Sequence, residues 1–441
     1  MSRRAIRRKV AITLLAWCAV AALAVPAHAA TVAPWRQHYR AAIDAHTRKD
    51  YKLFREELLK VREVIGGNSG LSYNLACSEA LLGHKGAALD YMREYAASGL
   101  MTNVLADSDL VSVWAGPDFQ RLALRIKANG RTAAPSTLVH TFADAGALIE
   151  DVSHDAHTGT WYASSVRRGL VFAFDSSGTE RRLAVAPDGW GAFAVSVDSI
   201  RRLLWVSVAA LPTTDGYSEA DSGRSALVCW DLVAGKVRKR LETPRTGARR
   251  LLGDMCLARD GTVYVSDSFQ GTIYRARPQD DSLQVVVADG VIRGPQTPAL
   301  AADGKRLYVA DAGTGISIVE LATGQVTPMR CKPGVCLEGI DGMVLSGGSL
   351  YAVQNGTRPQ RVARLVLDAK GDSIESWALC EQGGLSLGEP THGVIVDGGF
   401  VFIANSGWER LGRDEKLKDS LGARPAQLRR VPLAPVAAGK K

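Results

Sequence analysis

One phrase recurs through the later two thirds of the chain and constrains the fold more than any other feature. Its clearest copy is GDMCLARDGTVYVSDSFQGTIYR, residues 253–275, in which short alternating runs are separated by turns at Asp260-Gly261 and Gln270-Gly271. Alternation between Asp-Gly or Gly turns predicts short antiparallel strands. A phrase of this kind that recurs at a regular spacing indicates a repeat architecture.

The copies are traced by the aromatic residue in the second strand of each. They are TWYASS, LLWVSV, TVYVSD, RLYVAD, SLYAVQN and FVFIAN, with aromatics at 162, 205, 264, 308, 351 and 402. The spacings are 43, 59, 44, 43 and 51 residues, and a Ser-, Thr-, Gly- and Asp-rich insertion at 212–223 accounts for the longest. Six four-stranded units predict a mainly β fold, a six-bladed β-propeller over residues 138–435. A β-sandwich would not repeat whole phrases at this period. We expect residues 138–143 to close the ring by pairing near 428–433.

The first 29 residues have the pattern of a secretory signal peptide. Five basic residues lie within 2–9, an apolar run spans 10–25, and Ala27-His28-Ala29 offers a small-x-small cleavage site. The short run and the adjacent cleavage site favour a signal peptide over a membrane anchor. We therefore expect a periplasmic or secreted protein with no stable membrane span.

The charge balance argues against a nucleic-acid partner. The chain has 54 Lys and Arg against 45 Asp and Glu, and removal of the signal leaves about +4, from 49 basic and 45 acidic side chains. Apart from the 236–250 neighbourhood and a Lys440-Lys441 tail, the basic residues are scattered, so no basic patch or stripe is predicted.

Six cysteines remain after removal of the signal. Cys331 and Cys336 bracket Lys-Pro-Gly-Val, and in an oxidising compartment they form either a disulfide or two free thiols. The other four, including Cys77, lie in apolar patterns and are predicted to be small buried residues.

Residues 30–130 have helical periodicity and form a predicted first domain. The stretch 73–99 has small residues at 76 and 80, and 106–123 carries Asp107, Leu110 and Phe119. Both stretches resemble tetratricopeptide repeats (TPR), in which small residues let paired helices touch. The resemblance implies either a docking surface for an envelope protein or peptide, or a helical cap on the second domain. Residues 131–137 are the predicted linker.

In a propeller, the segments that lead into the innermost strands converge on the central channel. The residues predicted there are Glu150 in LIEDVS, Phe193 in GAFAVS, Asp254 in GDMCLA, Gln296 in PQTPAL, Asp341 in IDGMVL and His392 in THGVIV. Oxygen ligands from several sides suit Ca²⁺, and a site that includes His392 suits Zn²⁺ or Mn²⁺. Acidic residues at such positions also cap turns, so a structural role is the alternative.

These phrases resemble the senescence-marker-protein/gluconolactonase-like propellers and, more distantly, NHL-type propellers. The resemblance covers about 138–433 in pattern and implies a divalent metal held by Glu150, Gln296 and Asp341. Gln296 stands where the family has Asn, and Ile340 replaces the Pro of a PDGM-like phrase. The family has a further Asn-Asp-Gly phrase, and Asp254 is the one residue of that phrase that this chain keeps.

The resemblance implies hydrolysis of a small-molecule lactone or other ester. The metal would polarise the carbonyl, and Asp341 or Asp254 would take the proton of the attacking water. His392 is a further catalytic candidate because His392, Asp254 and Asp341 each lie ten residues before their aromatic.

Two arginines and a second function remain open. Arg249 and Arg250 are candidate substrate-binding residues or members of a solvated turn. The competing function is a non-catalytic module that contacts a protein or glycan through the helical region and the propeller rim.

Overall fold

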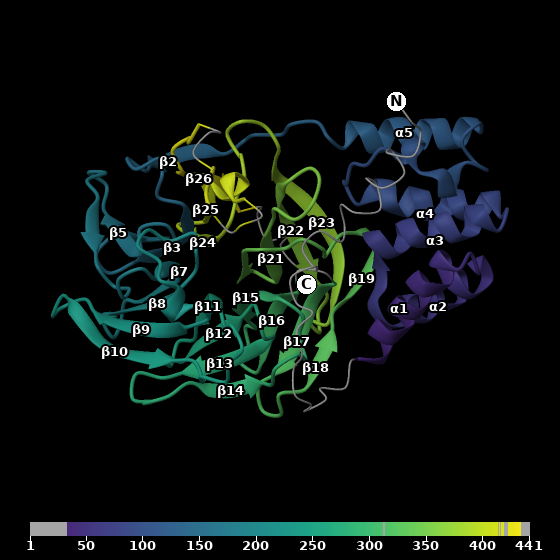
Figure 1. Ribbon diagram of the computed structural model, residues 1–441. Helices are drawn as coiled ribbons and strands as arrows, with labels where there is room; N and C mark the ends of the chain where they lie inside the picture. The colour runs from purple at the N-terminus through teal and green to yellow at the C-terminus, as the bar shows by residue number, and fades with distance from the viewer. Residues whose placement is uncertain (1–32, 312–313, 413, 415, 419–421, 434–441) are drawn as a thin grey trace, which may run out of the picture.

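The computed structural model describes residues 33–311, 314–412, 414, 416–418 and 422–433. It places a small helical region beside a β-propeller (Figure 1). The predicted signal peptide, residues 1–29, lies outside the described residues. None of the helices in the described part of the chain combines the length and apolarity needed to cross a membrane.

The helical region contains five α-helices within the described residues. They are α1 (Pro34–Thr47), α2 (Tyr51–Ile65), α3 (Ser69–Leu81), α4 (Lys85–Ala97) and α5 (Pro117–Ala128), with the 3₁₀ turns η1 (Val104–Ala106) and η2 (Ser108–Leu110) before α5. Proline occupies the first turn of α1 and α5, where no amide donor is needed. Asp50 caps α2 by accepting the Leu53 amide. The predicted helical front end is therefore confirmed.

Five sheets of the described structure have four strands each. They comprise β3 (Ile149–Asp155), β4 (Thr160–Ser165), β5 (Leu170–Phe174) and β6 (Arg181–Leu183); β7 (Gly191–Asp198), β8 (Leu203–Ala209), β9 (Ser225–Asp231) and β10 (Lys236–Glu242); β11 (Leu252–Leu257), β12 (Val263–Asp267), β13 (Thr272–Ala276) and β14 (Gln284–Val287); β15 (Pro295–Leu300), β16 (Arg306–Asp311), β17 (Gly315–Glu320) and β18 (Val326–Pro328); and β2 (Thr137–Thr141), β26 (Gln427–Pro432), β25 (Gly399–Ala404) and β24 (Gly393–Val396).

The remaining sheet departs from the four-stranded pattern. Its order is β1 (Gly66–Asn68), β19 (Arg330–Val335), β23 (Ser373–Gln382), β22 (Arg361–Leu367), β21 (Ser349–Gln354) and β20 (Met343–Ser346). The strands β1 and β19 run parallel at its outer edge. The helical region thus contributes a strand to the propeller, a feature that the repeat pattern did not predict.

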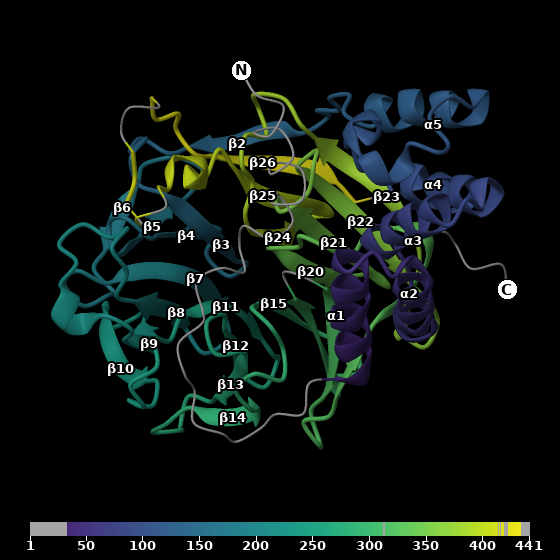
Figure 2. The ribbon, with the colours of Figure 1, turned by 45° about the vertical axis from the view of Figure 1, so that its right-hand side comes forward.

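The innermost strands β3, β7, β11, β15, β20 and β24 surround a common centre (Figure 2). Each packs against the next, and β24 packs against β3. The first strand of the propeller, β2, pairs with the last, β26, and Leu138 lies opposite Arg429. The β-propeller and its expected closure by the two ends of the repeat region are therefore confirmed.

The helical region is attached to the six-stranded sheet by a close backbone contact. A Cβ atom on Gly67 would lie 2.6 Å from Pro333 Cα. The helical region also contacts the neighbouring sheet, because Arg36 of α1 forms an ion pair of 2.6 Å with Asp311 on β16. The predicted linker is also held, because Ala133 exchanges backbone hydrogen bonds of 2.9 and 2.7 Å with Gln382.

Cys331 and Cys336 are free thiols in the structure. The intervening residues do not close a loop, because they belong to β19 and pair with β1. The disulfide alternative is therefore corrected, and the alternative of two free thiols holds.

Candidate functional site

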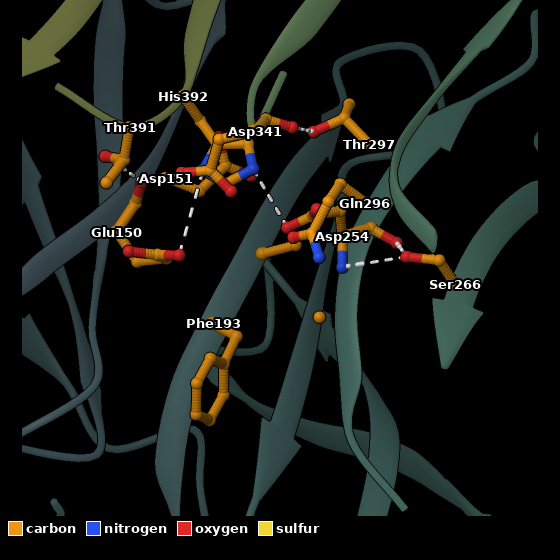
Figure 3. Close-up of polar contacts among 12 residues, drawn as sticks. Glu150, Asp151, Phe193, Asp254, Ser266, Gln296, Thr297, Asp341, Thr391 and His392 are labelled. Carbon is orange, nitrogen blue, oxygen red and sulfur yellow. Dashed lines mark hydrogen bonds and ion pairs between the residues drawn. The ribbon is translucent and has the colours of Figure 1, made fainter. Parts of the chain in front are cut away.

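Four of the predicted residues meet at the centre of the ring. Glu150 lies on β3 and Asp254 on β11, whereas Asp341 lies two residues before β20 and His392 directly before β24. Figure 3 shows His392 between Glu150 and Asp254, with Asp341 beside it. Residues that are far apart in the sequence therefore form one polar cluster.

An oxygen atom lies close to each ring nitrogen of His392. Its Nε2 lies 2.9 Å from Asp254 Oδ1, and its Nδ1 lies 3.1 Å from the Glu150 backbone oxygen. Burial by itself would lower the pKa of the imidazole, but Asp254, Asp341 and Asp151 together raise that pKa well above its usual value. The acidic neighbours therefore favour the charged form of the His392 imidazole.

The Glu150 carboxylate has a different partner on each oxygen. The Trp408 indole N–H donates to Oε2, whereas Oε1 lies 4.0 Å from His392 Nδ1. Burial and the nearby Asp341 raise the pKa of Glu150 well above its usual range. Because Trp408 holds Oε2, the other oxygen, Oε1, is the one that faces His392.

Asp341 is held by its neighbours on both the side chain and the backbone. Asn355 Nδ2 donates to Asp341 Oδ2 at 2.5 Å, and Thr297 Oγ1 donates to the Asp341 backbone oxygen at 2.7 Å. Burial raises the pKa of Asp341 to about 6. The following Gly342 has no room for a side chain, because a Cβ would lie 2.8 Å from His392 Cα. The glycine therefore allows the Asp341 and His392 loops to touch.

Hydroxyl groups connect neighbouring sheets around this cluster. Ser207 Oγ donates to the Gly253 backbone oxygen at 2.9 Å, and Thr391 Oγ1 donates to the Glu150 backbone oxygen at 2.7 Å. These bonds give the two buried backbone carbonyls a hydrogen-bond partner. They also fix the backbone that carries Asp254 and Glu150.

The cluster has the donor set of a divalent metal site. Glu150, Asp341 and His392 each offer one ligand atom, and these atoms lie within 4.8 Å of one another. Asp254 Oδ2 is buried and lacks a hydrogen-bond partner among the described residues. Converging carboxylates and an unpaired buried oxygen fit a bound cation.

Two predicted residues lie in the inner strands outside this ligand group. Gln296 donates from Nε2 to the Gly294 backbone oxygen at 3.3 Å, and its role as a ligand stays a prediction. Phe193 on β7 is buried and packs with Leu148 and Leu211, so this strand contributes an apolar residue.

Arg250 is bound by acidic partners within the protein, and its predicted part in substrate binding stays a prediction. Its guanidinium is 4% exposed and pairs with Asp267 at 3.1 Å and with Asp289 at 2.7 Å. It also donates to the Tyr274 hydroxyl at 2.9 Å. The guanidinium is therefore bound by side chains of the β11–β14 part of the chain. Arg249 lies over the Phe269 ring, at 5.2 Å from its centroid.

Sequence reasoning missed several members of the site. Asp151 accepts the Val195 amide at 2.9 Å, and burial raises its pKa to about 6. Burial also raises the pKa of Glu389 to about 7. Asp151 directly follows Glu150 in the same phrase, which was an available signal. Trp408 belongs to the connection between β25 and β26, which matches no repeat and gave no signal.

The comparisons with known proteins bear on the fold alone. No protein-family model matches the chain, and no curated protein matches it. Among solved structures, a luciferin-regenerating enzyme matches with 13% identity over 67% of this chain and 92% of its own, at a TM-score of 0.45. A streptogramin B lyase matches with 10% identity over 68% and 98%, at 0.46. Virginiamycin B lyase from Staphylococcus aureus matches with 10% identity over 64% and 87%, at 0.44. These likenesses carry no argument about activity.

Proposed function

We propose that this protein is a metal-dependent hydrolase of lactones or other esters. The observation that supports it is the convergence of Glu150, Asp341 and His392 from three sheets, with ligand atoms within 4.8 Å of one another. Asp254 adds a carboxylate with one unpaired oxygen beside this group. Perturbed titratable groups around a ligand set are typical of catalytic sites.

Glu150 and Asp341 would hold the metal through oxygen, and His392 would add one ring nitrogen after that nitrogen loses its proton. Two carboxylates and an imidazole favour Zn²⁺ or Mn²⁺, and an oxygen-only set favours Ca²⁺. The other ring nitrogen would keep its N–H, which metal-bound histidines commonly donate to a carboxylate or a backbone carbonyl. The bound metal would polarise the ester carbonyl and acidify water.

The residues around the metal ligands then have distinct roles. Asp254 orients His392 through Oδ1 and presents Oδ2, which can accept a proton from water. Asn355 holds Asp341 through the bond to Oδ2. Trp408 holds Glu150 through Oε2 and leaves Oε1 directed at the cluster. Preorganised donors of this kind lower the cost of assembling the reactive geometry.

The proposal extends to the finer classification of the chain. We count the six-stranded sheet as an enlarged blade, which makes the ring six-bladed, as in gluconolactonase-like propellers. Its support is the closed ring of six inner strands. A TPR-like origin of the helical region, and export to the periplasm or medium, belong to the same proposal.

The test is metal content and turnover of the mature protein. Asp341→Asn should remove one metal equivalent at the centre and lower hydrolysis of aryl esters and lactones by at least about 100-fold. Asp303→Asn, an exposed acid in a turn, is the matched control and should behave as wild type. Equal turnover in wild type and Asp341→Asn would contradict the proposal.

One observation favours the non-catalytic alternative, in which the helical region binds an envelope protein. Large apolar side chains of the η1–α5 segment are exposed, with Leu105, Val111 and Leu124 at 47, 58 and 68% exposure. Replacing Val111 and Leu124 by Asp should abolish binding of such a partner and leave ester turnover unchanged. Loss of turnover in this variant would argue against separate functions.

A further inference from the structure

A second group of metal-ligating side chains lies in the helical region, outside the propeller channel. Cys77 Sγ and carboxylate oxygens of Asp107 and Asp109 lie within 4.8 Å of one another. His46 Nε2 contacts Asp109 Oδ2 at 2.8 Å. The group therefore combines a thiol, two carboxylates and an imidazole.

Three separate elements bring these side chains together. Tyr73 and Cys77 lie one turn apart on α3, so they share a helix face, and both face Asp107. The Tyr73 hydroxyl donates to Asp107 Oδ2 at 2.6 Å, and Cys77 Sγ lies 3.9 Å from the same oxygen. Asp107 precedes η2, Asp109 lies within it, and His46 lies in the last turn of α1.

A structural role explains only part of this geometry. Asp107 caps η2 by accepting the Asp109 amide at 3.0 Å, which accounts for one of its oxygens. The cap does not account for a thiol directed at two carboxylates. Cys77 is 3% exposed and belongs to the helical core, as the sequence predicted, yet its sulfur also lies 3.9 Å from a carboxylate oxygen.

The composition of the group favours a cation, because two carboxylates lie beside a buried thiol. A divalent ion would neutralise the carboxylates and take the thiolate as its ligand, as metals do when they displace thiol protons.

We propose that Cys77, Asp107 and Asp109 form a second divalent-metal site, selective for Zn²⁺ or a similar thiophilic ion. The thiolate sulfur disfavours Ca²⁺ and Mg²⁺, which prefer oxygen ligands. The metal–sulfur bond forms as the thiol proton leaves to solvent. His46 positions Asp109, and Tyr73 positions Asp107, as outer partners of the ligands. The bound ion fastens α3 to the η2 segment.

The experiment uses Co²⁺ as the probe on the mature, full-length protein after chelator treatment. A thiolate ligand gives Co²⁺ an intense near-ultraviolet charge-transfer band, which carboxylate and histidine ligands do not give. Wild type and the channel variant Asp341→Ala should show the band, and Zn²⁺ should displace it. Cys77→Ser should lack it, whereas the matched control Cys380→Ser, on β23, should retain it.

Two further variants keep the test decisive if Cys77→Ser folds poorly. Asp109→Asn should weaken Co²⁺ binding and alter the band, and His46→Gln should lower affinity about 10- to 100-fold as an outer partner. Absence of the band in wild type, or a band that survives Cys77→Ser, would overturn the second site. Both results concern the helical region, so they leave the proposed channel function unaffected.

Discussion

His392 Nε2 lies 2.9 Å from Asp254 Oδ1, although the two residues belong to different sheets of the propeller. Each lies ten residues before the aromatic of its own repeat. Residues at the same repeat position thus meet across the ring, because the inner strands surround one centre. The contact sets the charge of the site, since Asp254 is the main group that raises the pKa of His392.

Asp254→Asn should therefore lower the pKa of His392 toward its ordinary value. The carboxylate favours the imidazolium, and an amide does not. The imidazole proton resonances of His392, followed by NMR from pH 5 to 9, measure this shift. Turnover of the proposed substrates should fall by about 10²- to 10⁴-fold as the base is lost. With Asp303→Asn as the control, an unchanged His392 titration in Asp254→Asn would show that the contact does not govern its charge.

Trp408→Phe should weaken metal binding at the channel by about 10- to 100-fold. The change keeps an aromatic ring but removes the N–H that donates to Glu150 Oε2, so the carboxylate loses its orientation. Titration calorimetry with Zn²⁺ or Mn²⁺ measures the effect. Trp114→Phe is the matched control, because the buried Trp114 Nε1 has no hydrogen-bond partner among the described residues. Equal weakening in both variants would point to a general loss of packing.

The repeat phrase predicted the propeller because strands, turns and the spacing of repeats are local properties of sequence. It also placed Glu150, Asp254, Asp341 and His392 at the channel, since their positions follow from the repeat register. The contact between Trp408 and Glu150 depends on a connection that matches no repeat. Such a contact follows from the closed ring and leaves no periodic signal.

Other features were missed because they join segments whose local patterns are unrelated. The stretch Gly66–Asn68 follows a helix and has no strand pattern, yet it pairs with β19. Cys77 lies in an apolar helix, so its burial was predicted, but the direction of its sulfur depends on the distant Asp107. Arg250 was predicted to lie at a possible site because its ion pairs with Asp267 and Asp289 could not be foreseen from the sequence.

Gly67→Ala should destabilise the protein by about 1–3 kcal/mol through overpacking. Its Cβ would lie 2.6 Å from Pro333 Cα, a backbone atom that cannot move aside without disturbing the pairing of β1 and β19. Gly86→Ala in α4 is the control, because no atom lies within 4 Å of its Cβ and Ala favours a helix. Urea denaturation should show opposite signs for the two variants. A stabilised Gly67→Ala protein would contradict the close contact.

Glu338→Gln should remove a pH-dependent loss of stability. Burial raises the pKa of Glu338 from 4.5 to about 7, while the Gly70 amide and the Ser69 side chain lower it. The folded state therefore binds the proton more tightly than the unfolded state does. The resulting stability is present below about pH 4.5 and is lost as pH rises through about 7, by on the order of 3 kcal/mol.

Denaturation of wild type and Glu338→Gln between pH 4 and 8 measures this loss. The Gln side chain stays neutral, so the free energy of unfolding of Glu338→Gln should increase relative to that of wild type across this interval. Asp341, Asp151 and Glu389 titrate in the same range in both proteins, and comparing the two proteins removes their contribution. Parallel stability curves would mean that Glu338 is not protonated in the folded state. The result bears on the helical region directly, because Gly70 and Ser69 of α3 are the groups that face this carboxyl.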